Sequence, residues 1–284
     1  MEKIVVVTDT GSNLSFAQAK ELGIYLLPLQ ITIDETTYQD TLEISTQDIY
    51  NELANGKMPK TSMAAYQKIY DLFEELKKDY DTIFAVPLTN GLSTNASTMQ
   101  SIARELEMNV HVIDMYATCA LEKHVAIWIK KLVDEHKSSE EILKIIQPAI
   151  DESNSLILVK NLQHLKRGGR LTPMAAALAG LLKIYPVLHI NKSTEGRIDV
   201  LNKVRTEKRA DAYAIDKIMD DIDIQHTHIY IIHSNFLEGA DHFKKCFIEK
   251  GVPEQNIHID YISSVIAVHT GLGCIAIQYI REEN

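Results

Sequence analysis

The sequence is poor in several residue types, and each shortage excludes a class of protein. Only three cysteines occur among the 284 residues, an odd number at wide spacings that fits neither a disulfide framework nor a zinc ligand pair. Seven prolines and twelve glycines, without any biased tract, indicate ordered structure throughout. No run approaches the ~18 apolar residues of a membrane span, and the apolar stretch near Met1 is too short for a signal peptide. We therefore expect a cytoplasmic protein with free, buried thiols.

Basic residues are also scarce, since 29 Lys and Arg stand against 39 Asp and Glu, for a formal net charge of −10. Nucleic acid is therefore not an expected partner, because phosphate binding requires a basic face. One basic segment, 166–170, stands out, although charge alone makes it typical of a solvated helix end. The hydrophobic content of 45% supports a substantial core. At ~100–200 residues per domain, the length predicts two domains.

Strands and helices alternate in residues 1–155. Short β-rich apolar runs are followed by amphipathic segments with helix-start signals, such as Ser15 and Gln18 at capping-box spacing. Strands are expected at 3–8, 25–33, 82–86 and 110–113, and helices at 15–22, 46–54, 61–77, 93–106, 117–136 and 139–153. This alternation predicts a three-layer α/β/α, Rossmann-like domain with a mostly parallel sheet.

Residues 156–284 have a different pattern. Thr172-Pro173 is a strong helix start, and segments 185–191 and 198–204 predict two antiparallel strands joined by a turn. Further strands are expected at 156–159, 229–233, 257–261 and 274–280, and helices from 206 and at 237–250. A hairpin combined with helices predicts an α+β domain with a mixed sheet.

Three polar loops are predicted where ligands collect in open α/β sheets, beyond the carboxyl ends of strands. They are Asp9–Asn13, Thr61-Ser62 and Asn90–Thr94, which offer hydroxyl groups and backbone N–H groups. Each alone is typical of helix capping, but three together favour a small anionic ligand. None contains Lys or Arg, so a singly charged carboxylate fits them better than a polyphosphate.

Two other functions fit part of this pattern. Gly91–Asn95 is one residue short of a nucleophile elbow, and Asp199 or Asp260 followed by His269 completes the chain order of an α/β-hydrolase. A serine esterase using Ser93 and His269 is therefore an alternative. A regulatory sensor of a carboxylate metabolite is another, because it would use the same loops.

Six segments together resemble the DegV family over essentially the whole chain. They are Val6–Thr10, Lys60–Ser62, Gly91–Thr94, Leu162–Leu171, Lys203–Thr206 and Val268–Gly273. The fourth contains L-x-x-L-x-R-G-G-R, which is highly specific. The resemblance implies a DegV-like fold and a bacterial fatty-acid-binding protein of the FakB type, the non-catalytic subunit of fatty acid kinase. Such a subunit presents a bound acyl chain to an ATP-using kinase subunit, which makes the acyl phosphate for phospholipid metabolism.

The resemblance also implies roles for particular residues. The fatty acid carboxylate would be bound by Thr61, Ser62, Ser93, Thr94 and His269, and the kinase subunit would dock on Arg170, Arg205 and His269. No catalytic group, metal or cofactor is expected, and membrane contact is at most transient. The ligand would have about 14–18 carbons, each buried CH₂ contributing ~0.8 kcal/mol.

The apolar tail is expected in a tunnel between the domains. Candidates for its lining are Leu29, Ile31, Met115 and a helix at 175–182. Two positions depart from the family pattern, since Ala64-Ala65 stands for the usual Pro-Ser and Thr94-Asn95 for Gly-Thr. These departures concern the geometry around the head group.

Overall fold

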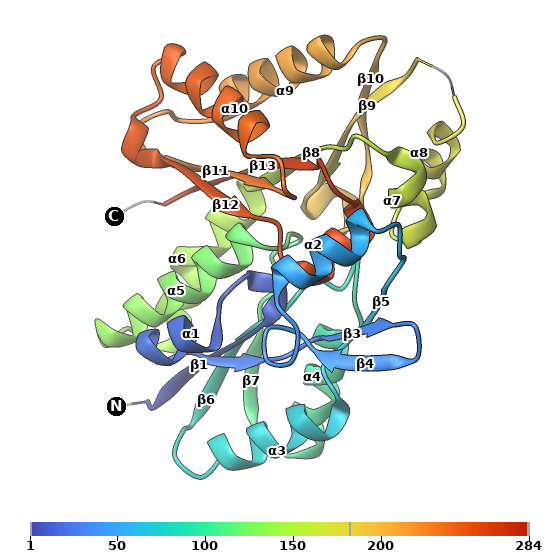
Figure 1. Cartoon of the computed structure of the whole chain (residues 1–284). Coiled ribbons are helices and arrows are strands. Elements are labelled where there is room, and N and C mark those ends of the chain that lie inside the picture. Colours follow the sequence, from blue (N-terminus) through green and yellow to red (C-terminus); the bar gives the residue numbers. More distant parts are fainter. Residues whose placement is uncertain (1, 182, 283–284) are drawn as a thin grey trace.

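The computed structural model describes residues 2–181 and 183–282, which build two large sheets and one small one (Figure 1). The first sheet has the order β2-β1-β6-β7 and is parallel throughout. Its strands are β1 (Ile4–Asp9), β2 (Tyr25–Leu27), β6 (Thr82–Val86) and β7 (Asn109–Val112). All six residues of β1 are buried, as expected for a central parallel strand covered on both faces.

Helices cover both faces of this sheet. One face packs against Phe73 and Met99 and the other against Leu121 and Ile146, in two separate core clusters. The helices of this half are α1 (Phe16–Leu22), α2 (Thr46–Ala54), α3 (Tyr66–Leu76), α4 (Asn95–Glu105), α5 (Ala120–Asp134) and α6 (Ser139–Glu152). The predicted three-layer α/β/α arrangement is confirmed.

A small antiparallel sheet lies beside the first one. It has the order β4-β3-β5 and consists of β3 (Gln30–Ile33), β4 (Thr36–Gln39) and β5 (Lys60–Ser62). Two predictions are corrected here. The expected single strand at 25–33 is divided between two sheets, because Pro28 interrupts it. The expected helix at 61–77 begins only at Tyr66, because residues 60–62 pair with β3 as an edge strand.

The second large sheet has the order β10-β9-β8-β13-β11-β12 and is mixed, with only β11 and β12 parallel. Its strands are β8 (Asn154–Leu158), β9 (Tyr185–Ile190), β10 (Asp199–Val204), β11 (Thr227–His233), β12 (Ile257–Tyr261) and β13 (Ile275–Arg281). The predicted hairpin of β9 and β10 and the mixed character of this sheet are confirmed.

The two faces of this second sheet have different neighbours. Helices α9 (Glu207–Asp221) and α10 (Leu237–Glu249) cover the outer face, with Phe243 and Phe247 buried between them and the strands. The inner face contacts the first half of the chain through Ile157, Ile232 and Ala276. Three short helices lie at this junction, α7 (Leu162–Gly168), α8 (Pro173–Leu178) and α11 (Ser264–Thr270). Short 3₁₀ turns occur at Thr10–Ser12, Lys192–Thr194 and Glu254–Asn256.

Within the described residues, no helix is long and apolar enough to cross a membrane. Cys119 and Cys274 are buried free thiols, and Cys246 is partly exposed.

A buried acid pair, Asp9 and Glu122, lies where β1 ends against α5. Asp9 accepts hydrogen bonds from the backbone N–H groups of Gly11 and Leu88 and from Asn95 Nδ2, at 2.8, 2.9 and 2.7 Å. Glu122 accepts only the Thr8 hydroxyl, at 3.2 Å. Burial and the neighbouring Asp9 charge therefore raise the pKa of Glu122 well above its usual value.

The raised pKa of Glu122 predicts that the free energy of unfolding depends on pH. Because the pKa of Glu122 is raised on folding, its contribution is fully present below the unfolded pKa near ~4.3 and is lost as pH rises through the folded pKa. Glu122→Gln should remove much of this loss, which amounts to about 1.4 kcal/mol per pH unit in that window. Urea unfolding at a series of pH values from about 4.5 upward measures it, with the exposed Glu74→Gln as control. Equal pH slopes in wild type and Glu122→Gln would contradict the assignment.

Candidate binding cavity between the domains

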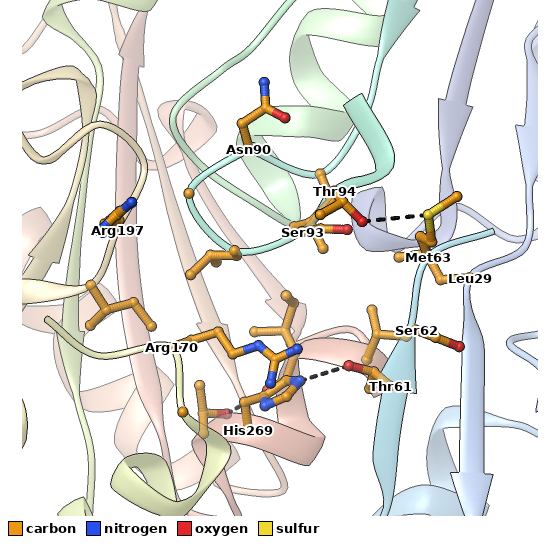
Figure 2. Close-up of a pocket in the computed structure, with 18 of the residues that line it drawn as sticks. Leu29, Thr61, Ser62, Met63, Asn90, Ser93, Thr94, Arg170, Arg197 and His269 are labelled. Atoms are coloured by element: carbon orange, nitrogen blue, oxygen red, sulfur yellow. Dashed lines mark hydrogen bonds between the residues drawn. The ribbon is translucent and has the colours of Figure 1, made fainter. Parts of the chain in front are cut away.

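A cavity of ≈ 520 Å³ lies between the two halves of the chain. Six segments line it: the residue before β3, β5 and the residue after it, the loop at 88–94, the turn after α7, the two residues before β10, and α11. Its polar lining residues include Thr61, Ser62, Asn90, Ser93, Thr94, Arg170, Arg197, His269 and Thr270, and its apolar ones include Leu29, Leu92, Ile198 and Ile266. Segments more than 200 residues apart in the sequence thus meet in one site (Figure 2).

His269 has hydrogen-bond partners on both ring nitrogens. Its Nε2 lies 2.8 Å from Thr61 Oγ1, and its Nδ1 lies 3.1 Å from the Gly168 carbonyl oxygen. Burial, with the positive charge of Arg170 next in importance, lowers the pKa of His269 to about 4. The imidazole is therefore neutral at physiological pH.

Glycine stands at each of the two central positions of the R-G-G-R segment for a different structural reason. A Cβ on Gly168 would lie 3.0 Å from His269 Nδ1 and 3.2 Å from its Cα, so a larger residue would require His269 to shift by a few tenths of an ångström. Gly169 ends the helix with a φ of +74°, a left-handed conformation that glycine adopts without strain. Arg170 then turns back and donates from Nη1 to the Gly168 carbonyl at 2.8 Å. The segment thus places a guanidinium beside the imidazole of His269 (Figure 2).

Thr61 and Ser62 lie on the edge strand β5 and point in opposite directions, as strand residues alternate. Thr61 faces His269, whereas the Ser62 hydroxyl donates to Gln30 Oε1 at 3.1 Å and points away from the imidazole (Figure 2). The expected helix N-terminus at this position is absent, because α3 begins at Tyr66 without a side-chain cap.

The loop at 88–94 supplies the opposite wall of the cavity. Ser93 Oγ accepts the Asn95 backbone N–H at 3.2 Å and keeps its own hydrogen available, while Thr94 Oγ1 contacts Met63 Sδ at 3.4 Å. Ser93 therefore has a donor to offer a ligand. Helix α4 starts two residues later than predicted, at Asn95.

The loop at Asp9–Asn13, the third expected ligand loop, does not line this cavity. Its polar groups serve the fold instead: Ser12 Oγ donates to the Asp9 carbonyl at 2.7 Å, and Thr10 Oγ1 accepts the Leu29 N–H at 3.1 Å. Two of the three predicted loops therefore converge on the cavity.

The cavity is more cationic than the loops indicated, since Arg170 and Arg197 both line it. Arg197 was missed because it belongs to a turn of the second half. That turn approaches the 88–94 loop so closely that a Cβ on Gly91 would lie 2.1 Å from the Gly196 carbonyl oxygen. The sequence feature that could have indicated Arg197 is the T-E-G-R turn between two predicted strands.

Arg205 does not join Arg170 and His269 in the cavity. It follows the last residue of β10, whereas Ile198, which borders the cavity, precedes the first. At about 3.3 Å per residue, the six-residue strand separates them by about 20 Å. A docking surface that used Arg170 and Arg205 would therefore extend along β10.

The residues of the alternative serine hydrolase are not arranged for catalysis. His269 Nε2 is paired with Thr61 rather than Ser93, and its Nδ1 faces a carbonyl group instead of a carboxylate. Asp199 accepts from Thr172, and Asp260 pairs with Lys123. Among residues 2–181 and 183–282, no cluster of His, Cys, Asp and Glu could hold a metal ion.

A second, smaller cavity continues inward from the first. It shares Leu92, Ile198, Ile266 and Thr270 with the first cavity, and its other lining residues include Ile157, Ile190, Ile232 and Ala276 of the second sheet. Its volume is ≈ 30 Å³. Of the expected tail-lining residues, Leu29 borders the first cavity, but Ile31 lines neither and Met115 belongs to the core on the other face of the first sheet. Helix α8 ends at Leu178, and Leu182 lies outside the described residues.

These features define a class: an α/β protein with a parallel and a mixed sheet, whose two halves enclose a cavity with polar and apolar lining residues. The sequence profile of the DegV family of uncharacterised proteins matches residues 3–282, and the chain belongs to this family. It is 30% identical, over the full length of both chains, to a DegV domain-containing protein of Halalkalibacterium halodurans.

Solved structures agree with this assignment. A fatty acid binding DegV family protein from Streptococcus agalactiae superposes with a TM-score of 0.91, at 29% identity and covering 100% of both chains. DegV from Bacillus subtilis, described as a fatty acid binding protein, gives a TM-score of 0.86 at 26% identity and covers 99% of this chain and 100% of its own.

Proposed function

We propose that this protein binds one long-chain fatty acid, with the carboxylate in the polar cavity and the acyl chain directed toward the small apolar cavity beside it. The observation that carries this proposal is that the polar cavity and the small apolar cavity share the side chains of Leu92, Ile198 and Ile266 in their lining. A buried carboxylate requires several donors, and burial of the chain contributes ~0.8 kcal/mol per CH₂. The two fatty-acid-binding relatives, which share the fold at 26–29% identity, support the same ligand.

Thr61 and Ser93 are proposed to contact the carboxylate, His269 to lie beside it and act through Thr61, and Ser62 and Thr94 to border it. Of the two hydroxyl groups on β5, that of Thr61 is the proposed carboxylate contact, because it faces His269 and the cavity. Arg170 and Arg197 add positive charge at the rim, which favours an anionic head group.

Extraction of the purified protein followed by mass spectrometry tests the proposal. One equivalent of a fatty acid of about 14–18 carbons is expected, since a chain of that length gains enough from burial to survive purification. Protein that neither carries a fatty acid nor binds one added in solution would refute it.

We further propose that the protein presents its fatty acid to a kinase subunit in the cytoplasm, where ATP is available, and performs no chemistry alone. The two arginines at the cavity rim support this step, because a guanidinium there can contact both an acidic partner and phosphate groups. Arg170, Arg205 and His269 are the proposed docking residues.

Arg170→Ala should separate presentation from binding. Acyl phosphate formation with a fatty acid kinase catalytic subunit should fall by about 10-fold or more, because a hydrogen bond to a charged group contributes ~1.5–3 kcal/mol. The fatty acid should remain bound, because its chain supplies most of the affinity. Lys166→Ala, an exposed position on the helix α7 that precedes Arg170, serves as control. Loss of the lipid from Arg170→Ala would show that the two roles are not separate.

A further inference from the structure

The hydrogen-bond directions around His269 are fixed by its partners. The Gly168 carbonyl at Nδ1 can only accept, so Nδ1 carries the hydrogen of the neutral imidazole. Nε2 then has a lone pair and accepts from the Thr61 hydroxyl, which has one hydrogen to give. In the empty cavity, Thr61 therefore presents only lone pairs to an incoming ligand.

A carboxylate also presents only lone pairs. If it approaches Thr61 Oγ1, two acceptors face each other with no hydrogen between them. Rotation of the Thr61 hydroxyl toward the ligand would leave His269 Nε2 as a buried acceptor without a donor, which is costly. One added proton removes the conflict.

We propose that the cavity binds its carboxylate ligand together with one proton, which His269 accepts at Nε2. The proton comes from solvent, and the carboxylate stays ionised. His269 then donates from Nδ1 to Gly168 and from Nε2 to Thr61, and Thr61 donates its own hydrogen to the carboxylate. Every donor in this chain has an acceptor. This inference rests on the proposed fatty-acid binding and gives His269 a role in it.

The charged groups around His269 help to keep the imidazole neutral in the free protein and would allow its protonation once a carboxylate is bound. Arg170, after α7, and His164, on α7, both disfavour protonation of His269, and Arg197 lines the same cavity. The segment β5 brings only the Thr61 hydroxyl to the ring, and Asp40 contacts α11 at its opposite end, through Ser264. A bound carboxylate would offset the charge of Arg170, and an opposite charge raises the pKa of a histidine.

The sign of the pH dependence follows. His269 is neutral in the free protein above pH about 4 and becomes protonated in the complex, so the complex carries more protons. Affinity should therefore rise as pH falls, by up to tenfold per pH unit at an uptake of one proton. The uptake should decline as pH rises through the pKa of His269 in the complex.

Isothermal titration of the whole protein with dodecanoate, in two buffers of different ionisation enthalpy, measures proton uptake directly. Uptake near one proton is expected at mildly acidic pH. His269→Gln should lose this uptake and show a flat pH profile, whatever its affinity. His164→Gln, the neighbouring histidine that does not line the cavity, should keep the uptake.

The outcomes separate the two proposals. Protein that binds neither dodecanoate nor a fatty acid of about 14–18 carbons would refute the proposed function itself. Binding without proton uptake would refute this inference and leave the proposed function intact. Uptake that persists in His269→Gln would place the proton on the ligand and overturn the role of His269.

Discussion

Replacing Ala276 by phenylalanine is expected to weaken binding of a long-chain fatty acid by roughly 200-fold. Ala276 lies on β13 and lines the small apolar cavity behind the head-group site. A benzyl group there would exclude the end of the acyl chain. At ≈ 30 Å³ this cavity holds about one methylene, so the chain end enters it only as the lining side chains move apart. A benzyl group that blocks about four methylenes from that path costs about 3 kcal/mol at ~0.8 kcal/mol each, which corresponds to that factor.

The length of the ligand provides the control. An acid too short to reach Ala276 should bind wild type and Ala276→Phe within about threefold, because its contacts lie in the first cavity. Overpacking of the core should also lower the free energy of unfolding of Ala276→Phe by about 1–3 kcal/mol. The titrations of wild type and Ala276→Phe are therefore performed well below the melting temperature of either protein. Equal affinity of Ala276→Phe and wild type for a long-chain acid would place the tail elsewhere.

Gly91→Ala is expected to damage both stability and binding through the contact between the two halves of the chain. A Cβ at Gly91 would lie 2.1 Å from the Gly196 oxygen and 2.6 Å from the Glu195 oxygen, both backbone atoms that cannot rotate away. The turn at 194–197 must therefore move, and Arg197 and Ile198 at the cavity rim move with it. We expect a loss of about 3 kcal/mol in the free energy of unfolding and about tenfold in fatty acid affinity.

Gly56→Ala is the matched control for this substitution. Gly56 has a φ of +81° and open space around its Cβ position, so alanine there brings backbone strain without a steric clash. It should cost about 1–2 kcal/mol and leave affinity unchanged. Denaturant unfolding and ligand titration of the two variants separate the effects. Gly91→Ala with wild-type affinity would show that the contact does not position the cavity rim.

The sequence predicted those elements whose signals are local. The capping box at Ser15 and Gln18 and the Thr172-Pro173 start of α8 are present as predicted, because each depends on residues within one helical turn. The strand β5 was mistaken for a helix start. Three residues carry too little periodicity to reveal a strand, and β5 exists because it pairs with β3, about thirty positions earlier.

For the same reason, the sequence predicted some residues of the candidate site and missed others. Thr61, Ser93 and His269 were recognised because they lie in polar loops and family motifs, and all three line one cavity. Arg197 was not, because a charged residue in a β-turn is usually solvated. Its place at the cavity depends on the approach of Gly196 to Gly91, which brings together residues more than 100 positions apart.

The sequence by itself determined the two-part α/β organisation, the polar loops and the DegV family, since these depend on periodicity, capping residues and linear motifs. Only the tertiary structure decided which polar groups face each other. It removed the Asp9 loop from the site, added Arg197 and separated Arg205 from Arg170. It also set the direction of the Thr61–His269 hydrogen bond, because a carbonyl from Gly168, 101 positions away, decides which nitrogen of His269 carries the hydrogen.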